Sequence, residues 1–306
     1  MFYISGFFDE AYGNLDAQIA LAKKLNVGYL CPRGIDGKNV SNYDAAEFQE
    51  KVLPRLNKNN IKLSSLGSPI GKVGIDDENG YQAQVAKLKE LVKIAQLSDT
   101  KYIRCFSFFT NGDNGEATKA KVIERWKGFL QTVEGTDTVL LHENEKKIFG
   151  DTPERALALY HALNHPNFKL CYDASNYIQC GVDPWKAYEA TKEFTVYYHM
   201  KDAINGIEVP LGMGEGHIKE ILADLAARGY DGFLTLEPHT AKYALLKRVF
   251  YCLFPLQFTK AAKVYRQIDK QYKIGAFKGV SREQVFVWQH ENLTKILDEI
   301  GGNYGK

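Results

Sequence analysis

Four short apolar runs in this chain each end in a side chain that can bind a metal ion. The four residues are Glu143, Asp173, His199 and Glu237, and the intervals between them are each about one strand-and-helix repeat long. If the runs are successive parallel strands, their ends meet at one mouth and the four side chains converge there. Three carboxylates and one imidazole form a hard, mostly oxygen site, which predicts one divalent ion among Mn²⁺, Zn²⁺, Co²⁺ and Mg²⁺.

The repetition distinguishes this pattern from chance. A single acidic residue after a strand is usually a helix cap or a solvated turn. Four candidate ligands at the ends of four successive runs are much harder to explain in that way. We therefore interpret the set as a metal centre.

Other polar side chains near predicted strand ends are candidates for binding a substrate. Arg104 lies inside the apolar run Tyr102–Phe106, where an unpaired charge is costly, so we expect it to pair with a site carboxylate or a substrate oxygen. The glycine-rich segment Gly212–Gly216 precedes a helix and is either a flexible turn or a site for an anionic group. The full set of substrate-binding candidates is Arg33, Ser68, Lys72, Arg104, His142, Asn176, Lys201 and His239.

A repeating order of strands and helices must position these residues. Each of the first seven strand-like runs is followed by a segment of helix length, such as the one that Thr152 caps and Pro153 begins. Eight such units predict a closed (β/α)₈ TIM barrel of the α/β class. An open doubly wound sheet fits less well, because no GxGxxG follows the first run. The runs are Phe2–Phe7, Val27–Cys31, Ile61–Leu66, Tyr102–Phe106, Thr138–His142, Phe168–Tyr172, Thr195–Tyr198 and Phe233–Leu236.

Composition sets broad limits on location and partners. The 306 residues are 45% hydrophobic and 25% charged, with a net charge of +2, which is ordinary for a globular protein and favours no nucleic acid partner. We expect one TIM-barrel domain over residues 1–306. Five cysteines without a CxxC pair, and a start without a signal peptide, indicate a reduced, cytoplasmic protein. No apolar stretch is long enough to predict a membrane span.

The last part of the chain departs from this rhythm. We interpret residues 240–280 as a helical insertion before the last helix, with a dense apolar patch at Val249–Phe258 and a basic stretch at Lys260–Lys278. Ser281–Gln284 is a capping box that opens a final helix, Arg282–Ile300. The insertion either covers the barrel edge as a helical hairpin or forms a lid or a contact between copies in a homo-oligomer.

Taken together, these residues resemble the xylose isomerase-like TIM barrel superfamily, the group of sugar phosphate isomerases, epimerases and endonuclease IV. The resemblance covers roughly residues 1–240. It implies that Glu143, Asp173, His199 and Glu237 bind a single divalent metal, as the matching residues do in ketose 3-epimerases, with the two glutamates as acid and base. The matching stretches are Gly67–Lys72, Ile103–Ser107, Leu141–Glu145, Asp173–Asn176, His199–Asp202, Gly212–Gly216 and Leu236–His239.

The chain departs from the superfamily at three places. Asn176 stands where many relatives have a histidine, and Leu30–Arg33 stands where many have a glutamate closing the second strand. The segment Gly67–Pro69 lacks the histidine that helps to build a three-zinc nuclease site. The first departure puts a substrate contact in doubt, and the last argues against an endonuclease.

The resulting hypothesis is a metal-dependent isomerase or epimerase of a sugar or sugar phosphate. The metal would polarise the substrate, and Glu143 and Glu237 would move a proton through a cis-enediolate. A lyase such as a keto-inositol dehydratase would use the same enolising step and then expel water. A DNA-repair endonuclease, with the basic stretch as its groove, and a non-catalytic sugar-binding barrel are weaker alternatives.

Overall fold

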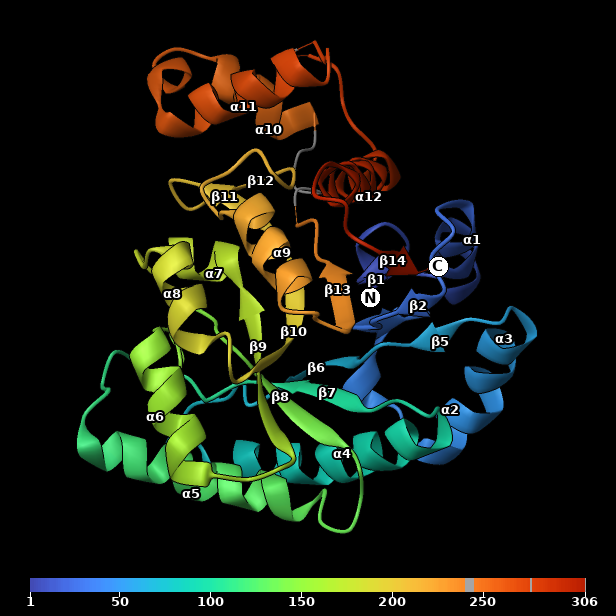
Figure 1. Ribbon diagram of the computed structural model, residues 1–306, viewed down its shortest axis with the longest axis vertical. Helices are drawn as coiled ribbons and strands as arrows, with labels where there is room; N and C mark the ends of the chain where they lie inside the picture. The colour runs from blue at the N-terminus through green and yellow to red at the C-terminus, as the bar shows by residue number, and fades with distance from the viewer. Residues whose placement is uncertain (240–244, 276, 306) are drawn as a thin grey trace.

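The computed structural model describes residues 1–239, 245–275 and 277–305, and its central element is a parallel barrel (Figure 1). The main sheet has the strand order β14-β1-β13-β10-β9-β8-β7-β6, and the short pair β2–β5 fills the interval between β1 and β6. The Cys31 N–H donates to Gly6 O and the Gly67 N–H to Pro32 O, both at 2.9 Å, so the ring of strands closes. The predicted barrel is confirmed. Its strands are β1 (Phe2–Gly6), β2 (Tyr29–Leu30), β5 (Lys62–Leu63), β6 (Leu66–Ile70), β7 (Tyr102–Cys105), β8 (Val139–Glu143), β9 (Phe168–Asp173), β10 (Thr195–Met200) and β13 (Gly232–Leu236).

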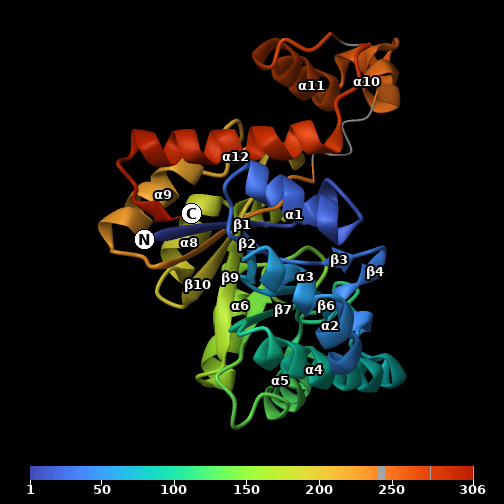
Figure 2. The same ribbon diagram turned by 90° about the vertical axis from the view of Figure 1, so that its right-hand side faces the viewer.

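Helices surround the barrel, as the two ribbon views show (Figures 1 and 2). Their starts follow the expected chemistry: the Thr152 side chain accepts from Arg155 N ahead of Pro153, and the Ser281 side chain accepts from Gln284 N. The outer helices are α1 (Leu15–Lys24), α2 (Ala45–Lys51), α3 (Leu53–Lys58), α4 (Glu78–Leu97), α5 (Glu116–Gln131), α6 (Pro153–Leu163), α7 (Ala174–Gln179), α8 (Pro184–Thr191), α9 (Ile218–Ala227) and α12 (Arg282–Glu299). None of the helices in the described part of the chain has the length and apolar character needed to cross a bilayer.

Short elements connect the strands to this ring. A hairpin of β11 and β12 lies between β10 and α9, and β14 pairs with the start of β1. All five cysteines fall within the described residues and are free thiols. The connecting elements are η1 (Phe8–Glu10), β3 (Gly34–Ile35), β4 (Lys38–Asn39), η2 (Val40–Asn42), β11 (Asp202–Ile204), β12 (Ile207–Val209) and β14 (Tyr304–Gly305).

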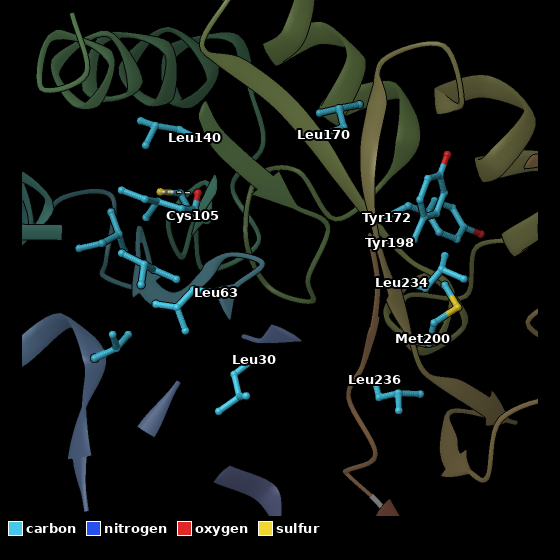
Figure 3. Close-up of a cluster of buried hydrophobic side chains, with 14 of the residues drawn as sticks. Leu30, Leu63, Cys105, Leu140, Leu170, Tyr172, Tyr198, Met200, Leu234 and Leu236 are labelled. Atoms are coloured by element: carbon cyan, nitrogen blue, oxygen red, sulfur yellow. Dashed lines mark hydrogen bonds between the residues drawn. The ribbon is translucent and has the colours of Figure 1, made fainter. Parts of the chain in front are cut away.

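Strand alternation sorts the side chains of the barrel into two sets. Figure 3 shows the outward set, in which Leu140, Tyr172 and Tyr198 point from the strands into the layer between sheet and helices. The inward set contains Leu141 and Tyr197. Because successive side chains of a strand point to opposite faces, the parity of a residue decides whether it can reach the barrel mouth from inside.

The late segment forms helices outside the barrel, at the top of Figures 1 and 2. They are α10 (Leu245–Cys252), η4 (Leu256–Phe258) and α11 (Lys260–Gln271). Val264, Tyr265 and Ile268 of α11 pack against Val209 of β12, forming an apolar cluster separate from the barrel core. The helices therefore rest on the hairpin that follows β10, while residues 240–244 of the expected insertion lie outside the described residues.

Candidate metal centre

The four predicted ligands meet at the C-terminal mouth of the barrel. Each offers one ligand atom, and these atoms of Glu143, Asp173, His199 and Glu237 all lie within 4.8 Å of one another. Glu143 shares the inward parity of Leu141, and His199 shares that of Tyr197, so the strand alternation directs both into the barrel. The register brings them together as well, since His199 pairs with Asp173 across β10 and β9.

The donor set fits a hard divalent ion. Three carboxylates and one imidazole provide mostly oxygen ligands, as Mg²⁺, Mn²⁺, Co²⁺ and Zn²⁺ accept in proteins. Glu143 Oε2 and Asp173 Oδ2 are buried and accept no hydrogen bond of good geometry from the described residues, although Arg104 and Lys201 lie within ion-pair distance of them. A bound cation would occupy the lone pairs that these oxygens keep free of hydrogen bonds.

Two cationic groups, together with the imidazole of His199, lie against the carboxylates of the cluster. Arg104 Nη1 lies 3.2 Å from Glu143 Oε2 and 3.8 Å from Glu237 Oε1, while Lys201 Nζ lies 2.9 Å from Asp173 Oδ2 and 3.3 Å from Glu237 Oε2. His199 Nδ1 lies 3.0 Å from Glu143 Oε1. The expected pairing of Arg104 with a site carboxylate is therefore present, and Lys201 likewise pairs with two carboxylates of the cluster.

These charges determine the ionisation of the two glutamates. Burial alone would raise the pKa of Glu143, but the charges of His199 and Arg104 outweigh it and lower that pKa to about 2. For Glu237, burial is outweighed by Lys201 and His239, and the pKa falls well below its usual value. Both glutamates are therefore ionised at neutral pH, in the form in which a carboxylate accepts a proton.

Arg33 and His239 lie on the solvent side of Glu237. Arg33 Nη1 is 3.6 Å from Glu237 Oε1, and the same guanidinium contacts Asp9 at 3.0 Å and Glu10 at 2.9 Å. His239 Nε2 is 3.0 Å from Glu237 Oε1 and 3.1 Å from Glu10 Oε1. Both side chains are partly exposed at the mouth, where a substrate could contact them.

Asn176 and Lys72 lie on the side of Glu143. The Asn176 amide donates to Glu143 Oε1 at 3.2 Å, and its backbone N–H donates to Asp173 Oδ1 at 2.9 Å, so it orients two predicted ligands. Lys72 Nζ is 3.0 Å from Glu145 Oε2 and lies over the Phe106 ring at 4.1 Å. Lys72 is therefore at the mouth but pairs outside the four-residue cluster.

Two predicted substrate contacts do not join this group. His142 has the outward parity of Leu140: its Nε2 bonds Ser107 Oγ at 2.9 Å, its ring lies near Trp126, and burial lowers its pKa to about 4. Ser68 donates its hydroxyl to Arg104 O at 2.5 Å and is fully buried. Their positions do not support the predicted contacts, because His142 faces the helix layer and Ser68 bonds the backbone.

The glycine-rich loop also differs from the expected anion site. The N–H groups of Gly212, Gly214 and Gly216 all donate to the Asp202 carboxylate, at 2.8–3.0 Å. A Cβ at Gly214 would lie 2.1 Å from Asp202 Oδ1, so the loop needs glycine for this close approach. The anion that the loop holds is thus a side chain of the protein itself.

The sequence reasoning missed an acidic pair that completes the mouth. Glu10 belongs to a second group of potential ligands, with Glu237 and His239, and Asp9 is the ion-pair partner of Arg33. The signal was present, since Asp9 and Glu10 follow the first strand as the other acidic candidates follow theirs. Phe7 was also missed; its ring lies edge-on to His199 at 5.2 Å and under Arg104 at 4.8 Å.

Solved structures share this architecture. The IOLI protein, solved with a binding zinc atom, has a TM-score of 0.68 at 16% identity, covering 97% of this chain and 99% of that one. D-allulose 3-epimerase from Methylomonas sp. has a TM-score of 0.68 at 14% identity, covering 97% and 98%. The probable 3-DHS dehydratase AsbF from Bacillus anthracis has a TM-score of 0.62 at 17% identity, covering 78% and 92%. At these identities the likeness shows the fold alone.

The sequence itself assigns the family. No curated protein matches the chain significantly. The model of one protein family, described as xylose isomerase-like TIM barrel, matches residues 19–262, which is most of the chain and includes all four predicted ligands. The protein therefore belongs to the xylose isomerase-like TIM barrel family.

Proposed function

We propose that the protein is a divalent-metal-dependent isomerase or epimerase of a sugar or sugar phosphate. The observation that carries this proposal is the buried cluster of Glu143, Asp173, His199 and Glu237 at the barrel mouth. It contains two ionised glutamates and a potential metal site. These are the groups that proton transfer at a carbon adjacent to a carbonyl group requires.

The four clustered side chains would hold the ion. When bound, it supplies a Lewis acid that polarises a substrate carbonyl and the neighbouring hydroxyl. The ionised carboxylates of Glu143 and Glu237 then act on the carbon-bound proton next to that carbonyl. Arg104 contacts both glutamates and Lys201 contacts Glu237, so cationic groups remain beside each carboxylate before and after it takes up a proton.

The positions of the glutamates suit a two-base reaction. Glu143 ends β8 and Glu237 ends β13, and in the sheet β9 and β10 lie between these strands. The glutamates thus approach the mouth from the two ends of a four-strand arc. One can remove a proton while the other returns it from the far side, which inverts the carbon; return at the adjacent carbon would exchange aldose and ketose.

A metal-dependent lyase is the second candidate. It would use the same enolising step, and a probable dehydratase is among the structures that share the fold. Product mass separates the two, because a lyase changes the mass of the substrate by one water and an isomerase does not. The nuclease and non-catalytic alternatives predict DNA binding that depends on salt, and indifference to chelators, respectively.

The cellular location of the protein and the class of its ligands are also part of the proposal. Five free thiols are compatible with a reducing compartment, so we propose the cytoplasm. The proposed ligands are small sugars or sugar phosphates, with no nucleic acid or membrane partner.

Glu237→Gln tests the proposed chemistry. We expect solvent deuterium exchange into an active ketose to fall by at least about a hundredfold, since the amide cannot accept the proton. Elemental analysis and thermal unfolding must accompany the assay, because a variant that merely loses its ion or its fold would also be inactive. Unchanged exchange in a folded, metal-containing Glu237→Gln would exclude Glu237 as base or acid.

A further inference from the structure

A cavity of about 260 Å³ lies between the barrel mouth and the late helices. Its barrel side is formed by Lys146, Gln179, Glu208 and His239. These residues follow β8, β9, β10 and β13 in turn, the same four strands that end in the predicted metal ligands. The cavity is therefore built on the metal-bearing half of the barrel.

A chain of polar contacts connects this cavity to the metal centre. His239 Nε2 is 3.0 Å from Glu237 Oε1, and His239 Nδ1 is 3.1 Å from Glu208 Oε1. The Gln179 amide donates to Glu208 Oε1 at 3.2 Å, and Lys146 Nζ donates to Gln179 Oε1 at 2.7 Å. His239 thus lines the cavity and also contacts the predicted ligand Glu237.

The late helices form the opposite wall. Lys247 and Tyr251 of α10 and Tyr265 of α11 line the cavity, and the two tyrosine rings are 5.0 Å apart with a 41° tilt. Flat aromatic faces are suited to the C–H faces of a sugar, and ammonium groups to an anion. The wall therefore combines an aromatic surface with a cation.

Charge favours an anion at this place. Residues 245–280 contain eight lysines and arginines and one aspartate, a net charge of +7 in a chain whose total is only +2. Glu208 is the acidic residue of the lining, and its carboxylate is already engaged by His239 and Gln179. The two lysines of the lining, Lys146 and Lys247, come from opposite walls and can approach one anionic group from both sides.

We propose that this cavity is a second subsite of the proposed isomerase, which receives a phosphate or carboxylate group of the substrate. The inference rests on the proposed function for the identity of the reacting end. Lys146 and Lys247 bind the anionic group, and Tyr251 and Tyr265 contact the carbon skeleton beside it. The late helices thus select a sugar phosphate or a sugar acid over a neutral sugar.

A binding measurement tests the subsite without any turnover. Inorganic phosphate and acetate are titrated calorimetrically into the metal-loaded protein, the double variant Lys146→Ala/Lys247→Ala and the control Lys263→Ala, whose lysine is exposed on α11. We expect one of the two anions to bind saturably, about tenfold more weakly in the double variant and unchanged in the control. The subsite is overturned if the double variant binds phosphate and acetate as tightly as the unmodified protein does, or if neither anion binds saturably.

An exchange assay then identifies the source of the anionic group. Ketoses, their phosphates and sugar acids are compared as substrates for solvent deuterium exchange. For the preferred anionic class, the double variant should raise KM about tenfold and leave kcat unchanged, with no effect on neutral ketoses. Equal KM for neutral and anionic substrates in the unmodified protein overturns the subsite.

The two proposals fail in different ways. If no sugar exchanges but anion binding depends on the two lysines, the proposed function fails and the subsite stands as a binding site. If neutral ketoses exchange and the anion titrations show no dependence on the lysines, the chemistry stands and the subsite fails.

Discussion

The candidate metal centre and the late helices differ in how their side chains are exposed to water. At the centre, the four predicted ligands are charged or polar and no more than 3% exposed. On α10, η4 and the segment between them, large apolar side chains face solvent: Leu246 is 83% exposed, Phe254 79% and Phe258 66%. Each arrangement is unfavourable by itself, because buried charges lose their hydration and exposed apolar surface orders water.

This contrast indicates which kind of partner would compensate the unfavourable arrangement in each region. Buried carboxylates are retained where they bind a cation or do chemistry, and large exposed apolar patches are typical of contact surfaces. The centre is positioned by neighbouring parallel strands of the barrel and their register. The late helices lie outside the barrel and contact the β11–β12 hairpin through the cluster around Tyr265 and α12 through Tyr272, which stacks on Trp288. In the proposed function, chemistry and recognition thus belong to different parts of the chain.

The largest expected effect is at the metal centre. Asp173→Asn keeps an oxygen that can cap α7 but removes a charge from the ligand set. We expect bound metal to fall well below one ion per chain and deuterium exchange to fall by about a thousandfold, or about 4 kcal/mol. Asp183→Asn, at the exposed cap of α8, is the matched control and should change neither quantity. Full metal content in Asp173→Asn would remove Asp173 from the ligand set.

A second prediction concerns the compensation of buried charge. Arg104→Met leaves Glu143 without its guanidinium, so the free energy of unfolding should fall by about 3 kcal/mol in urea titrations. Added divalent ion should restore part of that loss, because it binds the folded state and replaces the missing positive charge. Arg228→Met breaks a pair with Glu193 at the surface and should cost less than about 1 kcal/mol. An ion-independent loss in Arg104→Met would count against a metal beside it.

The smallest effect on stability, but a clear one on assembly, is expected at the exposed apolar face. We expect the protein to form a homo-oligomer through this face, and Phe254→Ser/Phe258→Ser to dissociate it while changing stability by less than about 1 kcal/mol. Light scattering at several concentrations measures the change. Because the basic helices repel each other, salt should strengthen the oligomer. Leu97→Ser, at a 40% exposed leucine of α4, is the control. A protein that is monomeric at high concentration contradicts this expectation.

The sequence predicted the barrel and its four clustered side chains because both depend on local patterns. Strand-like runs repeat at regular intervals, and parallel strands bring their ends together, so an acid at a strand end such as Glu143 could be placed without coordinates. His142 shows the limit of that argument: it is one residue away, and alternation turns it toward Trp126 instead of the mouth. Proximity to a strand end was a weaker guide than parity.

Other features depend on contacts between distant segments. The role of Asp202 could not be derived, because the hairpin β11–β12 must fold back before the carboxylate meets Gly212, Gly214 and Gly216. The cavity of Lys146 and Tyr265 requires the placement of α11 on that hairpin. The sequence pattern of the basic stretch Lys260–Lys278 does not indicate that the apolar side of its helix will contact β12.

The carboxylate of Asp202 has a consequence for how this protein could evolve. It accepts hydrogen bonds from a set of backbone N–H donors that, in another protein, would bind a phosphate. Through these bonds Asp202 also holds the start of the hairpin on which Glu208 lies. Exchange of this single carboxylate for a neutral side chain would vacate the donors while their backbone remains. A single substitution of Asp202 would therefore be enough to give the chain a site for a new anionic ligand.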